Sequence, residues 1–348
     1  MTVPDGTALG LDVERLEAHL RAQLPGLLRG PLEAVLVAGG RSNLTYLLSD
    51  GHGRWVLRRP PLGHVLATAH DMAREHRLLT ALHPTDVPVP VPVLLADDSV
   101  LGAPFYVMSF ADGVVLRERA DLELWSPVRA DALADELVDV LVRLHRVDPA
   151  QVGLADLGRP EGYLTRQLSR WQRQLASSHT RDLPELERLA ARLAEALPAS
   201  SAASSTAAVV HGDYRLDNVV VDPATGAVTA VLDWEMATLG DPLTDLASAV
   251  VWWDGMSGLD SPVAALPGDV AGFPSSERLV RAYADRTGAD LSALPWYLSF
   301  ALYKVAAIFE GIAARDQQGL TVGEGFDRLR DLVEPLVARG HDALNRRV

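Results

Sequence analysis

The sequence has 348 residues, of which 48% are hydrophobic and 22% charged, proportions typical of a globular protein with a buried core. Its length is about twice that of a usual domain, which favours two lobes or one large α/β unit. Because there is no cysteine, disulfide bonds, thiolate metal sites and a cysteine nucleophile are excluded. The net charge of −14 argues against nucleic-acid binding; it suits a cationic small molecule, although solubility alone explains it as well.

The sequence contains no obvious targeting or membrane-spanning segment. The opening stretch MTVPDGTALGLD lacks the positive and apolar regions of a signal peptide. The apolar runs are short or interrupted, as by Lys304, and none reaches the ~18 to 20 residues needed to cross a bilayer. We therefore expect a cytoplasmic protein with no membrane partner. Lys304 is also the only lysine, which constrains any mechanism that needs a lysine elsewhere.

The first part of the chain is predicted to be rich in strands. Apolar positions at helical spacing indicate helices at 11–28 and 67–82. Alternating apolar residues indicate strands, with a turn at Gly39–Gly40 and a stop at Pro60–Pro61. The expected extended segments are 33–40, 42–49, 53–60, 87–95 and 103–110.

After Asp112–Gly113 the composition becomes that of a helical region. A stripe of leucines and valines predicts a helix over 130–146, and PASSAASST (198–206) indicates a flexible loop. The other expected elements are helices at 161–176, 184–196, 243–253, 276–287, 291–316 and 325–344, and strands at 208–210, 218–222 and 227–234. We therefore expect an α+β fold with two domains, a β-rich lobe over 1–110 and a helical lobe over 111–348.

Two passages concentrate the residues suited to chemistry. In VVHGDYRLDNVVV (209–221) a strand leads to Asp213, and Asn218 follows five residues later; in VLDWEMATLGDPLTDLA (231–247) another strand leads to Asp233. Oxygen ligands at strand ends suit Mg²⁺, which takes one or two carboxylates and fills its other positions with water and phosphates. The remaining carboxylate can accept a proton from a substrate hydroxyl. Kinases use the Asp and Asn of one loop and an Asp of the next in this way.

HGDYRLDN followed by LDWEMATLGDPLTDLA resembles the aminoglycoside phosphotransferase (choline kinase-like) family, whose pattern is HGDxxxxN and then (I/L)DWxxxxxGDPxxDLA. The resemblance implies a bilobal protein-kinase-like fold with a small antiparallel-sheet N-lobe and a larger, mainly helical C-lobe. It also implies transfer of the ATP γ-phosphate to a small-molecule hydroxyl. Carried over by position, Asp213 is the expected catalytic base, and Asn218 and Asp233 are the expected Mg²⁺ ligands.

The same resemblance gives supporting roles to three residues. His211 and Asp241 would support the loops, and Asp245 would cap and brace a helix start. Simpler interpretations stay open: helix capping could be the whole role of Asp241 and Asp245, and His211 could simply hydrogen-bond to backbone near the loop. His145, at the end of an amphipathic helix, is expected to be structural.

Two N-terminal segments also resemble the family. GGRSNLTY (39–46) is similar to its G-x-S-N nucleotide loop, in which the backbone, Ser42 and Asn43 would lie at the phosphates, although a Gly–Gly hairpin turn explains the glycines equally. PFYVMSFADG (104–113) is similar to its hinge, which would bind adenine. The hinge residues implied are Met108 at the back of the pocket and Ser109, Phe110 and Ala111 along the base.

The third strand departs from the kinase pattern, because this lobe has no lysine to hold the phosphates. Strand alternation in WVLR places Val56 and Arg58 on one face, so Arg58 is the expected replacement, with Arg59 in reserve. Glu75 on the following helix is its expected partner. Arginine binds phosphate in a bidentate manner, so the substitution is compatible with function.

VLRRPP and YLSFALYKVAAIFEGIAAR (297–315) resemble one subgroup, the phosphotransferase domains fused to certain acyl-CoA dehydrogenases and their free-standing bacterial relatives. This resemblance makes a hydroxylated acyl compound a candidate acceptor ahead of an aminoglycoside, but the sequence does not decide between them. In the same region the aromatic residues are expected in the helical core, although the family binds acceptors in the helical lobe. Glu310 and Arg315 are expected on a solvated helix face, and the alternative is that they face that acceptor cleft. The expected core aromatics are Trp252, Trp253, Trp296 and Tyr297.

We therefore predict an ATP- and Mg²⁺-dependent phosphotransferase acting on a hydroxylated small molecule; the choice between ATP and GTP and the oligomeric state lie beyond the sequence. The alternative is a pseudokinase or regulatory nucleotide-binding module, supported only by Arg58 in place of lysine. A metal-dependent hydrolase is disfavoured because no HExxH or histidine cluster is present, and a serine hydrolase because no GxSxG occurs.

Overall fold

The computed structural model describes residues 10–37, 43–61, 71–177, 181–198, 207–259, 265–317 and 328–346. The chain divides into two compact units. The first comprises Met1–Asp112 and the short segment Ala230–Glu235, and the second comprises Gly113–Thr229 and Met236–Val348. The segment Ala230–Glu235 is joined to the first unit by a backbone hydrogen bond from Val231 to the Pro88 carbonyl (2.8 Å).

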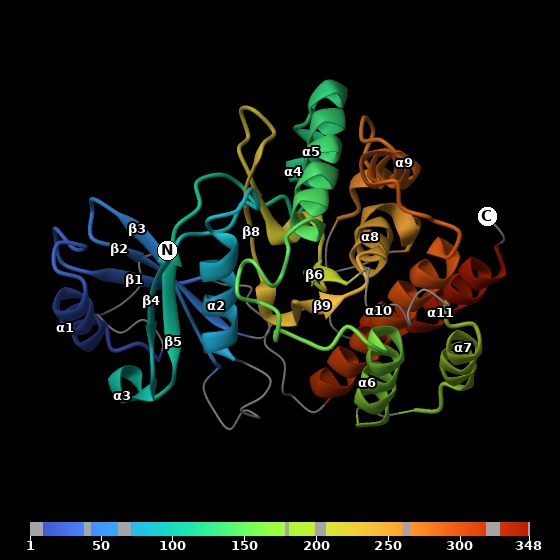
Figure 1. Cartoon of the computed structure of the whole chain (residues 1–348), viewed down its shortest axis with the longest axis horizontal. Coiled ribbons are helices and arrows are strands. Elements are labelled where there is room, and N and C mark those ends of the chain that lie inside the picture. Colours follow the sequence, from blue (N-terminus) through green and yellow to red (C-terminus); the bar gives the residue numbers. More distant parts are fainter. Residues whose placement is uncertain are drawn as a thin grey trace. The chain divides into compact units, whose positions relative to one another are not determined.

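The first unit is built on a five-stranded antiparallel sheet (Figure 1). The strand order is β1-β2-β3-β5-β4. The strands are β1 (Glu33–Leu36), β2 (Leu44–Ser49), β3 (Arg54–Arg59), β4 (Pro92–Ala96) and β5 (Phe105–Ser109). Pro92 begins an edge strand, the position where a residue without a backbone N–H is tolerated.

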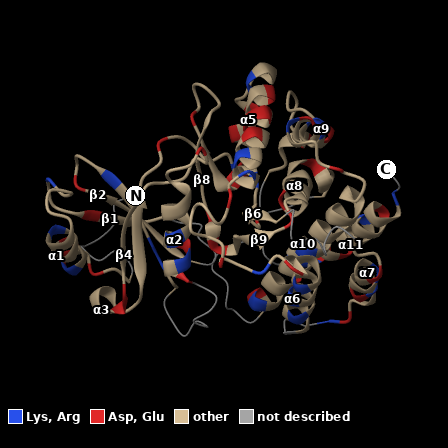
Figure 2. Ribbon diagram, in the orientation of Figure 1, with Lys and Arg blue, Asp and Glu red and all other residues tan. Residues whose placement is uncertain are grey.

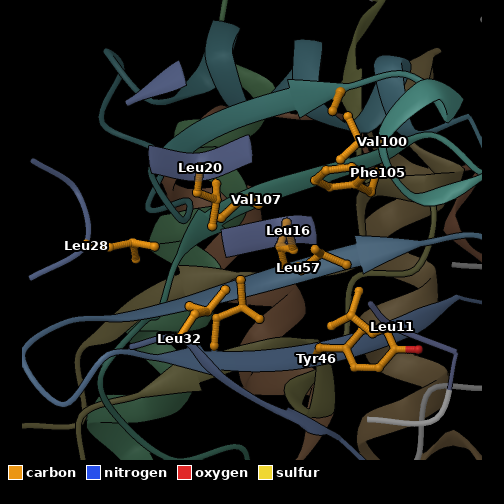
Figure 3. Close-up of a cluster of buried hydrophobic side chains, with 12 residues drawn as sticks. Leu11, Leu16, Leu20, Leu28, Leu32, Tyr46, Leu57, Val100, Phe105 and Val107 are labelled. Carbon is orange, nitrogen blue, oxygen red and sulfur yellow. The ribbon is translucent and has the colours of Figure 1, made fainter. Parts of the chain in front are cut away.

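Opposite faces of this sheet carry different chemistry. On one face, α1 (Val13–Gln23) packs leucines against strand residues such as Leu57 and Phe105, which gives the unit its hydrophobic core (Figure 3). The helix α3 (Asp98–Leu101) contributes Val100 to the same cluster. Helix α2 (Met72–Leu82) packs on β4 and β5. Since side chains alternate along a strand, Arg58 points away from the face that Leu57 occupies.

A single carboxylate ties two loops of this unit together. Asp50, in the turn after β2, accepts backbone N–H bonds from His52 and Gly53 and from Arg29 and Gly30, which lie between α1 and β1. Gly30 is required there, because a Cβ would lie 2.4 Å from the Asp50 carbonyl oxygen. The four bonds, that from Arg29 above all, hold the pKa of Asp50 well below its usual range.

We expect Asp50→Asn to lower the free energy of unfolding at pH 7, because an amide oxygen accepts these N–H bonds more weakly than a carboxylate. A depressed folded-state pKa contributes stability that is present above the unfolded value near 3.9 and lost as the pH falls through the folded value. The deficit of the variant relative to wild type should therefore shrink on acidification below about pH 4. Urea unfolding at several pH values measures it; a deficit independent of pH would contradict this role.

The second unit is mainly helical (Figure 1). Its helices are α4 (Arg119–Glu123), α5 (Pro127–His145), α6 (Tyr163–Ser177), α7 (Pro184–Glu195), α8 (Leu243–Val250), α9 (Ser276–Thr287), α10 (Leu294–Gln317) and α11 (Leu329–Asn345). Short antiparallel strands β6 (Ala208–Val210) and β9 (Thr238–Gly240) pair with each other. Strand β7 (Val219–Val221) pairs with β8 (Val228–Val231), whose last two residues belong to the segment Ala230–Glu235. The observed strands and helices confirm the expected α+β class.

Helix α10 is the central element of the second unit and packs against α6, α7, α8 and α11. Contrary to the expectation from sequence, it is long and apolar enough, by length and composition alone, to cross a membrane, the one such helix among the described residues. Within the fold, 78% of its most apolar window is buried, as in the core helix of a globular unit. Its apolar character is therefore accounted for by packing.

Charged residues pair between two helices of this unit. Figure 2 colours the positions of Lys, Arg, Asp and Glu along the ribbon. Aspartates spaced four apart on α5 face arginines of α9: Arg278 Nη2 lies 2.7 Å from Asp135 Oδ2, and Arg286 Nε lies 2.5 Å from Asp139 Oδ1. These ion pairs join α5 to α9 and neutralise part of the protein's excess negative charge.

The structure differs from the sequence prediction mainly in short elements. Helices α3 and α4 and strand β9 were not predicted, and residues Val251–Gly255 form a π-helical turn in place of the end of the predicted helix 243–253. The Gly39–Gly40 turn, most of the predicted loop 198–206 and the first residues of the predicted helix 67–82 lie outside the described residues.

The prediction for Glu310 was wrong. This residue is buried, and its Oε2 accepts from Arg181 Nη2 (3.0 Å) and Nε (3.2 Å). The prediction of a solvated position is confirmed for Arg315, which is exposed. The core prediction is confirmed for Trp253, Trp296 and Tyr297, which are buried.

Candidate active site

The loop after β6 holds the HGD motif in one conformation. The Asp245 carboxylate, in the first turn of α8, accepts backbone N–H bonds from His211 (2.6 Å) and Gly212 (2.8 Å). Gly212 has a φ of +84°, and a Cβ there would lie 2.7 Å from the Met236 carbonyl oxygen, so the position requires glycine. The motif residues His211 and Asp245 thus act on the loop backbone.

Asp245 is itself held by a buried histidine. His145 Nε2 lies 3.3 Å from Asp245 Oδ2, and His145 Nδ1 lies 2.8 Å from the Tyr283 hydroxyl of α9. Burial would raise the pKa of Asp245, but the hydrogen bond and charge of His145 lower it below its usual range. Asp245 is therefore a carboxylate that braces the loop, and His145 has the structural place predicted for it.

Asp241, unlike Asp245, caps the start of α8. Its Oδ1 accepts the Leu243 N–H (3.0 Å), and its Oδ2 accepts the Tyr297 hydroxyl of α10 (2.5 Å). The predicted capping interpretation therefore applies to Asp241, which also links α8 to α10.

Asp213 is surrounded by hydrogen-bond donors. Its Oδ2 accepts from Asn218 Nδ2 (2.9 Å) and lies 3.3 Å from Arg215 Nε, and its N–H donates to His211 Nδ1 (3.2 Å). Burial would raise the pKa of Asp213, yet the positive charges of Arg215 and Lys304 lower it below its usual range. The side chain is therefore ionised at neutral pH and can accept a hydrogen bond from a hydroxyl.

Asn218 ends the short 3₁₀ turn Leu216–Asn218 and is buried. Its Nδ2 donates to both the carbonyl and the carboxylate of Asp213 (2.9 Å each). With its amide nitrogen used in this way, its Oδ1 is the atom suited to a hard cation. The structure thus brings together Asp213 and Asn218, as the motif spacing predicted.

A pocket within the second unit lies beside Asp213 and encloses about 610 Å³, open solvent included. Most of its lining is aromatic or aliphatic, including Trp171, Phe300 and Ile308. Lys304 is the only cation that lines it among the described residues, and its Nζ donates to the Gly212 carbonyl. Asp213 therefore faces a mainly apolar pocket with one buried ammonium group.

The first unit holds a second cluster of charged residues. Arg58 Nη2 lies 2.9 Å from Asp233 Oδ1, and Arg58 Nη1 lies 3.4 Å from Glu75 Oε2. Burial would lower the pKa of Arg58, but its anionic neighbours raise it, while burial raises the pKa of Glu75. Arg59 lies apart and donates to the carbonyls of Gly10 and Leu101. Of the two arginines considered from the sequence, the structure brings Arg58 to Glu75.

Tyr106 and Glu235, which the sequence did not single out, complete this cluster together with the predicted Asn43. The Tyr106 hydroxyl of β5 donates to Glu75 Oε2 (2.9 Å), and Asn43 Nδ2 lies 3.2 Å from Glu235 Oε2 and 3.3 Å from Glu75 Oε1. Asn43 is thus buried as a brace between two carboxylates. Ser42, the other residue implied for the phosphate loop, lies outside the described residues.

Asp233 has an unusual backbone. Its φ of +64° makes it the only non-glycine residue with positive φ among those that the structure describes. Such a conformation is costly for most residues and is tolerated by aspartate, and it is often found at functional sites. The side chain is one-third exposed, and its Oδ1 is engaged by Arg58, so Oδ2 is the oxygen suited to a cation.

The predicted hinge lies at the end of β5. Met108 is buried on the strand. The Ser109 N–H donates to the Val91 carbonyl (2.8 Å) and the Phe110 N–H to the Arg54 carbonyl (3.2 Å). The Ala111 N–H makes no hydrogen bond within the described part of the chain, so it is the hinge amide suited to a ligand.

Within the described ranges, no cluster of three or more His, Cys, Asp or Glu side chains forms a preassembled metal site. This agrees with a cation such as Mg²⁺, which is bound by one or two protein oxygens and completed by water and phosphate. The Oδ1 of Asn218, in the second unit, and the Oδ2 of Asp233, in the first, are each hard oxygens of the kind that such a cation takes.

A family model described as the phosphotransferase enzyme family matches residues 33–297. The chain belongs to this family. The motif resemblance described above is thereby confirmed. The match includes both HGDYRLDN and LDWEMATLGDPLTDLA, so this phosphotransferase carries the family's motifs in both units.

Curated relatives of this phosphotransferase are longer proteins. It is 36% identical over 340 residues to acyl-CoA dehydrogenase family member 11 of Gallus gallus, a match that covers 94% of this chain and 43% of that protein. It is 34% identical over 327 residues to acyl-CoA dehydrogenase family member 10 of Mus musculus, with 91% and 30% covered. The chain therefore spans less than half the length of the curated relatives it matches.

Solved structures confirm the protein-kinase-like fold. A Ralstonia eutropha protein provisionally assigned as an aminoglycoside phosphotransferase is 33% identical, with a TM-score of 0.82 over 97% of this chain and 99% of that one. The GDP and kanamycin complex of APH(2″)-IIIa has a TM-score of 0.64 at 17% identity, with 93% and 98% covered, a likeness of fold alone. The expected antiparallel-sheet N-lobe and helical C-lobe are both present.

Several residues of this phosphotransferase site were not predicted as site residues. Tyr106 and Glu235 hold the Arg58 cluster, and Arg215, Lys304 and Trp171 surround Asp213 and its pocket. Arg215 lies inside the HGD motif, and Lys304 is the only lysine, so both were visible signals. Glu235 lies inside LDWEMATLGDPLTDLA and was visible in the same way, whereas Trp171 had no sequence signal, because its importance depends on its position beside Lys304 in the fold.

Proposed function

We propose that this protein transfers the γ-phosphate of ATP to a hydroxyl group of a small molecule, in a reaction that requires Mg²⁺. The observation that carries the proposal is Asp213, an ionised carboxylate on a braced loop beside a mainly apolar pocket. Membership of the phosphotransferase family supports the reaction class.

The residues proposed to bind the nucleotide lie mainly in the first unit. Arg58 would contact the phosphates, and its Nε, which is buried without a partner among the described residues, is a donor that a phosphate oxygen would satisfy. The N–H of Ala111 would bind an edge of the base. Asn218 Oδ1 and Asp233 Oδ2 would hold Mg²⁺, which neutralises charge on the phosphates.

The chemical role proposed for Asp213 is to orient the acceptor hydroxyl. Phosphoryl transfer passes through a loose transition state, so positioning and charge stabilisation matter more than deprotonation before the attack. An ionised Asp213 accepts the hydroxyl hydrogen bond and then takes its proton as the new oxygen–phosphorus bond forms. The bond between the γ-phosphorus and the bridging oxygen breaks at the same time, and ADP leaves. Asn218 and Arg215 keep the carboxylate oriented while this happens.

The acceptor we propose is a hydroxylated acyl compound in preference to an aminoglycoside. The pocket beside Asp213 is lined mostly by apolar side chains and contains a buried ammonium group, and such a lining suits an apolar chain better than a polycation. The curated relatives are named as acyl-CoA dehydrogenase family members, which supports the same choice. Binding measurements with ATP and with GTP identify which of the two nucleotides is the phosphate donor.

Thermal unfolding with nucleotide and Mg²⁺ tests the proposal. ATP at about 100 times its dissociation constant should stabilise the protein by about 2.7 kcal/mol, which for a chain of this size raises the melting temperature by a few degrees. The shift should require Mg²⁺ and disappear with EDTA, and a parallel series with GTP identifies the preferred donor. No shift with either nucleotide would contradict the proposal, and a shift without turnover of any acceptor would favour a nucleotide-binding pseudokinase.

A further inference from the structure

The pocket beside Asp213 contains two hydrogen-bond donors that the protein does not fully use. Lys304 Nζ donates to the Gly212 carbonyl and lies 5.5 Å from the centre of the Trp171 ring. An ammonium group has three N–H donors, so the hydrogen bond to the Gly212 carbonyl does not use all of them. Trp171 is 3% exposed, and its Nε1–H has no partner within the part of the chain that the structure describes. Both residues line the same pocket.

Unused donors of this kind need an explanation, because buried polar groups are almost always hydrogen-bonded. Of the two carboxylates that line the pocket, Asp245 is engaged through both oxygens and Asp213 through Oδ2. Asp245 accepts from the His211 and Gly212 amides and contacts His145, and Asp213 accepts from Asn218 and contacts Arg215. No acceptor within the described residues is bonded to the Trp171 Nε1–H, so this donor is available to an acceptor atom of a bound molecule.

The remaining lining restricts the molecule that brings this atom. Phe300, Val305 and Ile308 of α10 and Val251 of the π-helical turn form apolar walls. Burial lowers the pKa of Lys304, while Asp213 and Asp245 oppose that effect. An ammonium group that has lost its water in this way gains most from a ligand oxygen, and it disfavours a ligand that is itself a cation.

We propose that Lys304 and Trp171 form an oxygen-binding subsite, which takes a carbonyl or carboxylate oxygen of a molecule with an apolar chain. Resting on the proposed function, the subsite would orient the acceptor by an oxygen other than the hydroxyl that receives phosphate. Lys304 is then a specificity-determining residue. It joins acceptor and catalytic loop, because the same ammonium group holds the Gly212 carbonyl next to Asp213.

Binding of four eight-carbon probes tests this subsite without nucleotide. Calorimetric titration with octanoate, octanamide, octan-1-ol and octylamine changes the head group at constant chain length. A hydrogen bond to a charged donor predicts that wild type binds octanoate, octanamide or both at least about tenfold more tightly than octanol. Octylamine should bind most weakly. Octanoate against octanamide distinguishes a carboxylate from a neutral carbonyl.

Three variants assign the effect to the donors. Lys304→Met keeps the volume and should bring the affinity for octanoate and octanamide down to that for octanol, whereas Lys304→Arg should keep the preference. Trp171→Phe keeps a ring beside Lys304 and should reduce the preference severalfold. Ile308→Val, the matched control on the apolar wall, should weaken all the probes in proportion. If Lys304→Met unfolds the loop, Trp171→Phe still decides the question.

The subsite is overturned if wild type binds octanol or octylamine as tightly as octanoate and octanamide, if none of the probes binds, or if Lys304→Met retains the preference. Its failure is distinguishable from failure of the proposed function, because the Mg²⁺-dependent nucleotide shift is measured separately. A carbonyl preference without a nucleotide shift would leave the subsite and remove the phosphotransferase. A nucleotide shift without the carbonyl preference would support the phosphotransferase and overturn the subsite.

Discussion

Asp213→Asn should lower the rate of phosphoryl transfer by about 10² to 10⁴-fold, the usual contribution of a positioned general base. The asparagine can still accept from Asn218 through its amide oxygen, so the loop should keep its shape. Nucleotide binding should change little, because the proposed phosphate and base contacts come from Arg58 and Ala111. Acceptor-dependent ADP release gives the rate, and the Mg²⁺-dependent thermal shift gives the binding.

The matched control is Asp285→Asn, an aspartate to asparagine change on an exposed position of α9. Its rate and thermal shift should equal those of wild type. An Asp213→Asn protein that retained more than a tenth of the wild-type rate would show that this carboxylate is not the base. A parallel loss of the nucleotide shift would mean that the substitution had disturbed the fold.

Arg58→Met should both destabilise the protein and remove its response to nucleotide. Arg58 is the cation between Asp233 and the buried Glu75, and removal of one partner from a buried ion pair costs about 3–5 kcal/mol. The phosphates would also lose their proposed arginine contact. Urea unfolding measures the first effect, and the ATP–Mg²⁺ thermal shift measures the second.

The double variant Arg58→Met/Glu75→Gln separates stability from binding. With the buried carboxylate neutralised, much of the lost free energy of unfolding should return, while the nucleotide shift should stay absent. Arg58→Lys should keep the shift, because a lysine serves this purpose in other kinases. If the double variant responds to nucleotide as wild type does, Arg58 is a structural residue only.

Much of this site could be predicted from local sequence. The position of Asp213 and Asn218 on one loop follows from a strand and a five-residue spacing. Strand alternation predicted the face that Arg58 occupies, and its pairing with Glu75 came from the kinase pattern of a strand cation beside a glutamate on the next helix. The loop spacing and the strand face depend on patterns that a few consecutive residues reveal. The helices α3 and α4 escaped prediction because four or five residues are too few to show a helical period.

Contacts between distant segments could not be predicted in this way. Lys304 is 92 positions from Gly212, and Glu310 is 129 positions from the Arg181 that keeps it buried. No local pattern encodes either pair, and acidic residues are mostly exposed, which favours a solvated helix face for Glu310. Lys304 was singled out as the only lysine, yet its place at the catalytic loop became visible only in the fold.

Transfer of label from [γ-³²P]ATP tests the central claim most directly. Wild-type protein and Asp213→Asn are incubated with ATP, Mg²⁺ and a panel of hydroxyacyl compounds beside aminoglycosides, with EDTA controls. We expect label in at least one hydroxyacyl product with wild type and Mg²⁺, about 10² to 10⁴-fold slower labelling with Asp213→Asn, and none with EDTA. Label that stays in ATP, or that is released only as inorganic phosphate at the same rate by both proteins, would contradict a phosphotransferase that uses Asp213.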